Sequence, residues 1–236
     1  MIASLFHADN PAYFDLDHLR QSAAEFVRGA RLLRKARAGD KTAAVALKIG
    51  FWPFVEGFEL AIDQQVLPRE PLTRKFGDHV MRRVFVRMAR AVREMKSEEG
   101  SHAAHWRKDA ECLGVRDLGN ECVPAVQALI DRAYTRNLPS FFATLAGTEF
   151  IAEELSRFLI EADDFTNLFS RRRWVWGEVH LAPHEDGPSH LEIDLDLARA
   201  YDANTSPAAI ERMVVDTMRL FGTAADEVEG SLLVSS

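Results

Sequence analysis

The chain has 236 residues, 47% hydrophobic and 28% charged, which is enough apolar material for one large globular domain. Its net charge of −7 argues against a nucleic-acid-binding protein, because such proteins carry a basic patch. With two cysteines, no signal-peptide pattern and no apolar run long enough to span a membrane, we expect a cytoplasmic protein with reduced thiols.

Apolar residues spaced three or four apart recur along the chain, and no segment alternates as a strand does. Residues 1–15 are expected to form an irregular arm, and Asp15 or Asp17 can cap a first helix that ends at Gly39. Further helices are expected over residues 43–67, 73–112, 123–133, 141–161, 163–176 and 207–228, before a polar tail over 229–236. The sequence therefore predicts a single all-α domain over residues 1–236.

The helix over 43–67 contains an aromatic segment, whose members are Phe51, Trp52, Phe54 and Phe58. Pro53 lies inside this segment and predicts a kink there. Glu56 and Glu59 lie among the aromatic residues, and each either faces solvent or is held by a partner. We expect the aromatic segment to form one wall of an apolar substrate cavity, since ligand sites in helical bundles lie between helices.

Two carboxylates and two imidazoles lie within residues 98–105, inside a predicted helix. Glu98 and Glu99 precede His102 by four and three residues, so either pair can lie on one helix face. A Glu-x-x-His pair that points into a helical bundle is how carboxylate-bridged di-iron and di-manganese sites are built. The alternative is a solvated, charged face near the end of an amphipathic helix.

Two further segments carry possible metal ligands. Glu149 follows the small residues Ala146 and Gly147, which allow another helix or a ligand to approach closely. Three of the eight histidines lie within eleven residues, at positions 180, 184 and 190, with Asp186 between them. Imidazole and carboxylate are the usual ligands of non-haem iron, zinc and manganese, so metal binding is expected at this segment.

With these segments located, the chain resembles the haem-oxygenase-like di-metal oxidases, whose helical bundle is shared with thiaminase-II-type proteins and the pyrroloquinoline-quinone maturation oxidase. The nearest group is the chlamydial protein associating with death domains and its bacterial relatives. The first motif of this group is Glu-Glu, a short gap, His, then Trp and Leu-Gly, and it matches Glu98-Glu99, His102, Trp106 and Leu113-Gly114. The gap before the histidine is shorter here, and is similar to the Glu-x-x-His of the undecene-forming fatty-acid decarboxylase.

The second motif of the family, one glutamate in a mid-chain helix, matches Glu149. The third motif is His-x3-Asp-x2-His about thirty residues later, and His180 lies 31 positions after Glu149. The residue four after His180 is His184, so the chain departs from the pattern. A small insertion gives His180, Asp186 and His190 as ligands. We prefer this set to His184, because Pro183 turns the chain away from a regular helix.

A different frame of the third motif begins at His190 and continues to Asp194. It leaves Leu197 at the position where the family has its last histidine. The resemblance covers residues 45–200 and depends on the three motifs alone.

The resemblance implies a haem-oxygenase-like helical bundle that binds two iron ions, or one iron and one manganese. The implied ligands are Glu98, Glu99, His102, Glu149, His180, Asp186 and His190. The implied activity is that of an oxidase or oxygenase that uses dioxygen to oxidise a small organic substrate, and we expect a homodimer with no nucleic-acid or membrane partner. The alternatives are a non-catalytic ligand-binding protein and a metal-free thiaminase-like enzyme. The latter would need a cysteine in the pocket, whereas Cys112 and Cys122 are expected at a helix end and in a loop.

The tyrosines distinguish two forms of the implied reaction. The relatives that make 4-aminobenzoate consume a tyrosine and a lysine of their own chain. Here Tyr13, Tyr134 and Tyr201 all lie outside the helices expected to line the site. Since transfer from a side chain requires close approach, we predict an external substrate and multiple turnovers.

Overall fold

The computed structural model describes residues 14–182, 189–202 and 206–234, and within them the chain forms helices and no strand. The elements are α1 Leu16–Gly29, α2 Arg31–Arg37, α3 Lys41–Asp63, α4 Arg69–Phe76, α5 Asp78–Cys112, α6 Pro124–Ala133, α7 Leu138–Ile160, α8 Asp163–Thr166, the 3-10 helix η1 Ser170–Arg172, α9 Val175–His180, α10 His190–Tyr201 and α11 Pro207–Val234. The expectation of an all-α fold is confirmed. His184 and Asp186 lie outside the described residues.

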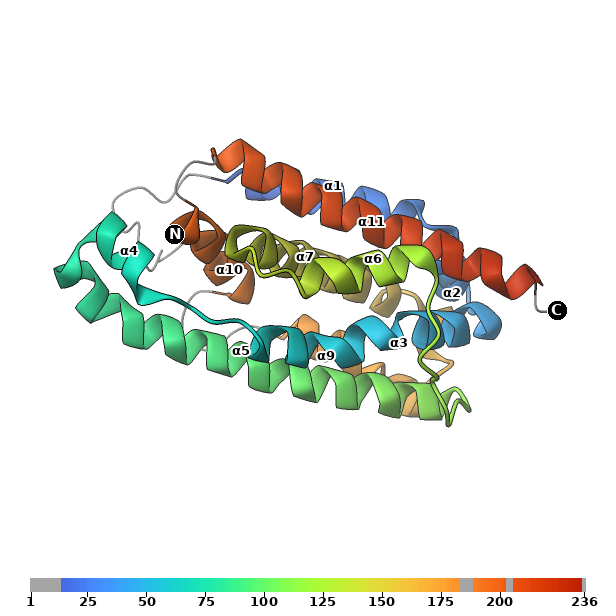
Figure 1. Cartoon of the computed structure of the whole chain (residues 1–236). Helices are drawn as coiled ribbons and strands as arrows, with labels where there is room; N and C mark the ends of the chain where they lie inside the picture. The colour runs from blue at the N-terminus through green and yellow to red at the C-terminus, as the bar shows by residue number, and fades with distance from the viewer. Residues whose placement is uncertain (1–13, 183–188, 203–205, 235–236) are drawn as a thin grey trace.

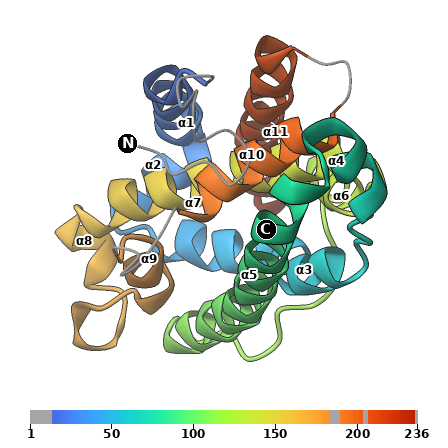
Figure 2. The same cartoon turned by 90° about the vertical axis from the view of Figure 1, so that its left-hand side faces the viewer.

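The helix α7 lies at the centre of the bundle, where it packs against α1, α9, α10 and α11 (Figure 1). Every residue of α7 from Phe141 to Gly147 is buried, as expected of a helix segment in the core. The long helix α5 runs along one side of the bundle and packs on α3. Figure 2 shows α10 lying across α7 near α4, so α5, α7 and α10 approach one another at this end of the bundle.

Several helix boundaries agree with the expectations from sequence. The side chain of Asp15 accepts a hydrogen bond from the His18 N–H and caps α1, and Asp40 caps α3 in the same way. The chain turns at Gly114, whose φ of +92° suits glycine, just after α5 ends. The helix α3 continues through Pro53, and the kink expected there stays a prediction.

Other boundaries differ from those expected. The expected helix from residue 73 to 112 is two helices, because Gly77 adopts a φ of +81° between them. The expected helix over 163–176 is interrupted, and its last part forms α9 instead. The prediction of a polar tail over 229–236 is wrong for residues 229–234, which continue α11.

The helix α10 is absent from the sequence expectations, although it has a clear local signal. Ser189 caps it by accepting a hydrogen bond from the Glu192 N–H, and the Glu192 carboxylate accepts one from the Ser189 N–H. This reciprocal capping box follows from Ser-x-x-Glu ahead of an apolar run. The prolines and the glycine that precede Ser189 in the sequence indicate an irregular segment, so no helix is expected there from composition alone.

Candidate metal centre

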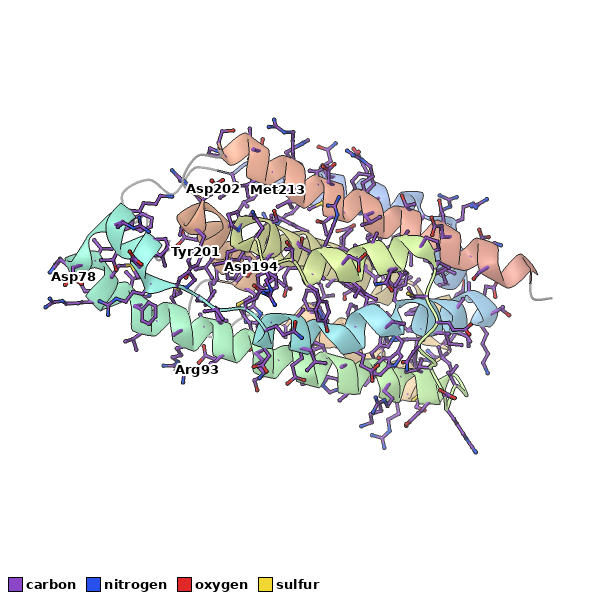
Figure 3. The ribbon with its side chains drawn as sticks, in the orientation of Figure 1. Asp78, Arg93, Asp194, Tyr201, Asp202 and Met213 are labelled. Carbon is purple, nitrogen blue, oxygen red and sulfur yellow. The ribbon has the colours of Figure 1, made fainter. Side chains whose placement is uncertain are left out.

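Helices α5, α7 and α10 bring four carboxylates and two imidazoles together inside the bundle. These side chains are Glu98, Glu99 and His102 from α5, Glu149 from α7, and His190 and Asp194 from α10. Nε2 of His190 lies 3.2 Å from a Glu98 oxygen, and its Nδ1 lies 3.9 Å from a Glu149 oxygen. Nδ1 of His102 lies 3.2 Å from Glu99. Figure 3 shows Asp194 in the interior of the bundle, whereas Arg93 points away from the outer side of α5.

The carboxylates of this cluster repel one another. Burial, and then the charge of Glu99, raise the pKa of Glu149 to about 8, although His102 partly offsets the effect. Burial, and then Glu149 and Glu99, raise the pKa of Asp194 well above its usual value. Within the described residues, neither side-chain oxygen of Asp194 has a hydrogen-bond partner. These carboxylates are therefore costly to ionise unless a cation joins them.

Positive charge in the cluster comes from histidine. Burial by itself lowers the pKa of His102. The hydrogen bond and the charge of Glu99 outweigh burial, together with the weaker effects of the Glu149 and Glu98 charges, so the His102 pKa is raised. In the described part of the chain, none of the four carboxylates forms an ion pair with lysine or arginine. Among the residues that the structure describes, the cluster is thus rich in negative charge and has no lysine or arginine to balance it.

His180 reaches the same region from α9 and stays neutral. Its ring lies against those of His102 and Trp176, at centroid distances of 4.2 and 3.9 Å. Burial, and then the charge of His102, lower the pKa of His180 to about 3. Nδ1 of His180 lies 2.7 Å from the Trp176 carbonyl oxygen, to which it donates in the neutral ring. Its Nε2 therefore keeps the lone pair that a metal ligand needs.

The donor set suits a divalent metal, although the donors do not yet enclose one. Among the described residues, no group of three or more His, Cys, Asp and Glu side chains is close enough to hold an ion as it stands. A bound cation would give the Asp194 oxygens a partner and would reduce the repulsion between the carboxylates. Imidazole and carboxylate are the ligands of iron and manganese, so the residues fit the expected metals.

An apolar cavity adjoins the cluster. Its polar lining comes from Glu99, His102, Thr148, Glu149 and His180, and the remaining lining residues are Phe51, Phe54, Val55, Phe58, Trp106, Ile151, Ala152, Leu155, Trp176 and Phe221. Water-sized spheres can occupy about 50 Å³ of it, which is room for a few water molecules.

The aromatic segment of α3 divides between two surfaces. Phe51, Phe54 and Phe58 line the cavity, since residues three and four apart share one helix face. The expectation that Trp52 belongs to this wall is wrong: Trp52 lies on another face of α3, where the Arg107 guanidinium stacks on its ring at 4.7 Å. Glu56 is half-exposed and lies 3.6 Å from Arg107.

The structure thus brings together Glu98, Glu99, His102, Glu149 and His190 of the predicted ligands, with His180 beside them. Asp186 cannot be placed, because it lies outside the described residues. Asp194, which belongs to the frame that was not preferred, lies in the cluster instead, and the capping box before α10 is the signal that could have favoured it.

One tyrosine also lies elsewhere than expected. Tyr201 is on α10, seven residues after Asp194, where its ring stacks on Phe142 at 6.2 Å. The expectation that every tyrosine lies outside the helices lining the site is therefore wrong for Tyr201.

Comparisons with known proteins address the fold. No protein-family model matches the chain, and no curated protein matches it. Among solved structures, the chain is similar to a TenA homolog from Pseudomonas syringae pv. tomato str. DC3000, with a TM-score of 0.60 and 19% sequence identity over 92% of this chain and 93% of that one. At this identity the likeness establishes a shared helical fold. In addition, none of the described helices is both long and apolar enough to cross a membrane.

Proposed function

We propose that the protein is a non-haem di-metal oxidase or oxygenase that uses dioxygen to oxidise a small organic substrate. The observation that carries the proposal is the group of four carboxylates from three helices, of which Glu99, Glu149 and Asp194 are largely shielded from solvent and Glu98 lies at the exposed edge. Among the described residues the group has no lysine or arginine partner, and imidazoles lie beside it. A purely structural cluster would be expected to carry a basic side chain, because buried carboxylates are otherwise paired or bound to metal.

The residues that would hold the metals are Glu98, Glu99, His102, Glu149, His180, His190 and Asp194. Four carboxylates balance the charge of two divalent cations, and this stoichiometry favours two iron ions, or one iron and one manganese. When bound, the metals would supply the binding and activation of dioxygen. Glu98 has the most exposed carboxylate of the cluster, with 47% of its side chain accessible, so this edge is where an ion can enter.

The chain itself contributes a largely apolar cavity and fixed donors. The apolar walls around Phe54 and Phe58 exclude water from a substrate held beside Glu149 and His102. Burial, and then the charge of His102, keep the His180 ring neutral, and the Trp176 carbonyl fixes its tautomer, so His180 needs no deprotonation before it binds metal. We expect an external small-molecule substrate, and a cytoplasmic homodimer remains our prediction.

A metal-free thiaminase-like enzyme is the second candidate, because the fold is similar to that of a TenA homolog. Such an enzyme would need a cysteine facing the cavity. Cys112 is exposed, Cys122 is half-buried, and neither lines the cavity beside Glu149. The positions of the cysteines therefore favour the metal-dependent enzyme over this candidate.

The test is dioxygen consumption by the metal-free protein after it is loaded with Fe(II) and given a reductant. We expect uptake by the wild type, and none above the free-iron background by Glu149→Gln. The matched control is Glu153→Gln, since Glu153 lies one turn further along α7 and pairs with Arg157. Equal uptake by all three proteins would contradict the proposal.

Mass spectrometry of the wild type after this incubation separates the two forms of the reaction. A loss of mass at Tyr201 or Tyr134 would indicate that the protein consumes one of its own side chains instead of an external substrate.

A further inference from the structure

A lysine and an aspartate, neither of which is a candidate ligand, form an ion pair deep in the core near His180. Lys48 of α3 is 1% exposed, and its Nζ lies 3.6 Å from Oδ2 of Asp109 on α5. The ammonium lies 3.7 Å from the ring centre of Trp106, 5.2 Å from that of Trp174 and 5.9 Å from that of Trp176. Burial lowers the pKa of Lys48 to about 7, against the opposing charge of Asp109.

Such a pair is not explained by stability. Removing two charges from water costs more than their attraction returns in many proteins, and apolar replacements of buried pairs are often neutral or stabilising. Burial raises the pKa of Asp109 as well, although Lys48 and the backbone N–H groups of Trp176 and Val175 favour its ionised form. The contacts that Asp109 makes indicate a different use.

Asp109 holds the first turn of α9. Its Oδ2 accepts a hydrogen bond from the Trp176 N–H at 3.1 Å, one of the N–H groups that a helix start leaves without a partner. With six residues, α9 is too short to be stable alone. The backbone carbonyl oxygen of Trp176 in turn accepts a hydrogen bond from Nδ1–H of His180. A continuous path therefore runs from Lys48 through Asp109 and Trp176 to His180.

We propose that Lys48 and Asp109 are positioning residues that fix α9 and thereby the tautomer and orientation of the His180 ring. Lys48 holds the Asp109 carboxylate in place, Asp109 holds the Trp176 backbone, and the Trp176 carbonyl leaves Nε2 of His180 as the ring's acceptor. The use of that acceptor for metal rests on the proposed function, whereas its tautomer does not.

The experiment compares two double variants, Lys48→Met with Asp109→Leu and Lys48→Met with Asp109→Asn. Both lack the ion pair, but only the asparagine retains an oxygen that can accept from Trp176. In metal-free protein with ¹⁵N-labelled histidine, His180→Gln identifies the His180 ring signals by their loss. We expect a single Nδ1–H tautomer in the wild type and in the asparagine variant, and a mixture of tautomers in the leucine variant. The Tm of the leucine variant should equal or exceed that of the wild type.

A single wild-type tautomer that persists in the leucine variant would overturn the proposal. So would a Tm that falls without a change of tautomer, because the pair would then be only structural. Amide exchange in the wild type is a second test that needs no folded variant. The backbone amide of Trp176 should exchange at least tenfold more slowly than the backbone amide of Gly177, the next residue in the first turn of α9. Equal rates would contradict the hydrogen bond from the Trp176 N–H to Asp109.

Cobalt(II) binding separates this proposal from the proposed function. If the wild type binds Co(II), the leucine variant should bind it roughly 10–100-fold more weakly, as is usual when the support of a metal-bound histidine is removed. If the wild type binds no Co(II) but the tautomer changes as expected, the positioning role stands and the metal site is refuted.

Discussion

Replacing Glu149 by glutamine should stabilise the metal-free protein while abolishing its stabilisation by metal. Burial and Glu99 raise the pKa of the Glu149 carboxyl from 4.5 to about 8. The folded protein therefore binds more protons than the unfolded chain between these pH values, and its stability falls as the pH rises through this window. Glutamine has nearly the same shape and no charge to bury, so it avoids this loss.

The size of the effect follows from the shift in pKa. At pH 7, linkage gives an upper limit of about 3 kcal/mol for the free energy of unfolding that glutamine restores. The Glu149 side chain is 21% exposed, and water there reduces the gain, to about 1–3 kcal/mol. For a chain of this size, each kcal/mol raises Tm by about 2–4 °C, so a rise of about 5 °C is expected. Below pH 4.5 the gain should disappear.

Thermal unfolding of chelator-treated wild type, Glu149→Gln and Glu153→Gln, at pH 4 and at pH 8, measures this directly. Addition of Mn(II) should then raise the Tm of the wild type and of the Glu153 control, but not that of Glu149→Gln. A Glu149→Gln protein that is less stable than wild type at pH 8, or a gain that is independent of pH, would refute the reasoning.

Three further outcomes are expected. Asp194→Asn should remove metal binding and leave helicity unchanged, as measured by isothermal titration with Mn(II) and by circular dichroism; unchanged affinity would exclude Asp194 as a ligand. Metal affinity should rise between pH 6 and pH 8, because binding displaces a proton from Glu149, and titration in buffers of different ionisation enthalpy should detect proton release. Phe54→Ala should enlarge the cavity and lower the free energy of unfolding, measured by urea denaturation, by about 3 kcal/mol. Metal binding should be retained, and its loss would mean that Phe54 shapes the cluster itself.

The helical class and the pairing of Glu99 with His102 could be predicted from sequence, because both depend on local spacing. Glu99 and His102 share a face of α5 through helix geometry alone, whichever helices surround them. The same geometry separates the faces of α3: Trp52 follows Phe51 directly and therefore lies on a different face from Phe51, Phe54 and Phe58.

Non-local features could not be predicted in this way. Asp194 enters the cluster because α10 packs across α7, and nothing in the spacing after Pro188 fixes that crossing. The pairing of Lys48 with Asp109 joins residues 61 positions apart in the chain, on helices whose order of packing the sequence does not state. Gly77 ended a helix that periodicity alone would have continued.

The most direct test of the central claim is the metal content of the protein after expression with iron supplied. Elemental analysis of the purified chain should find about two iron ions, or one iron and one manganese, per polypeptide, and none in Glu149→Gln. A folded, helical wild type that contains no iron or manganese, and takes up none from Fe(II) under anaerobic conditions, would contradict the claim.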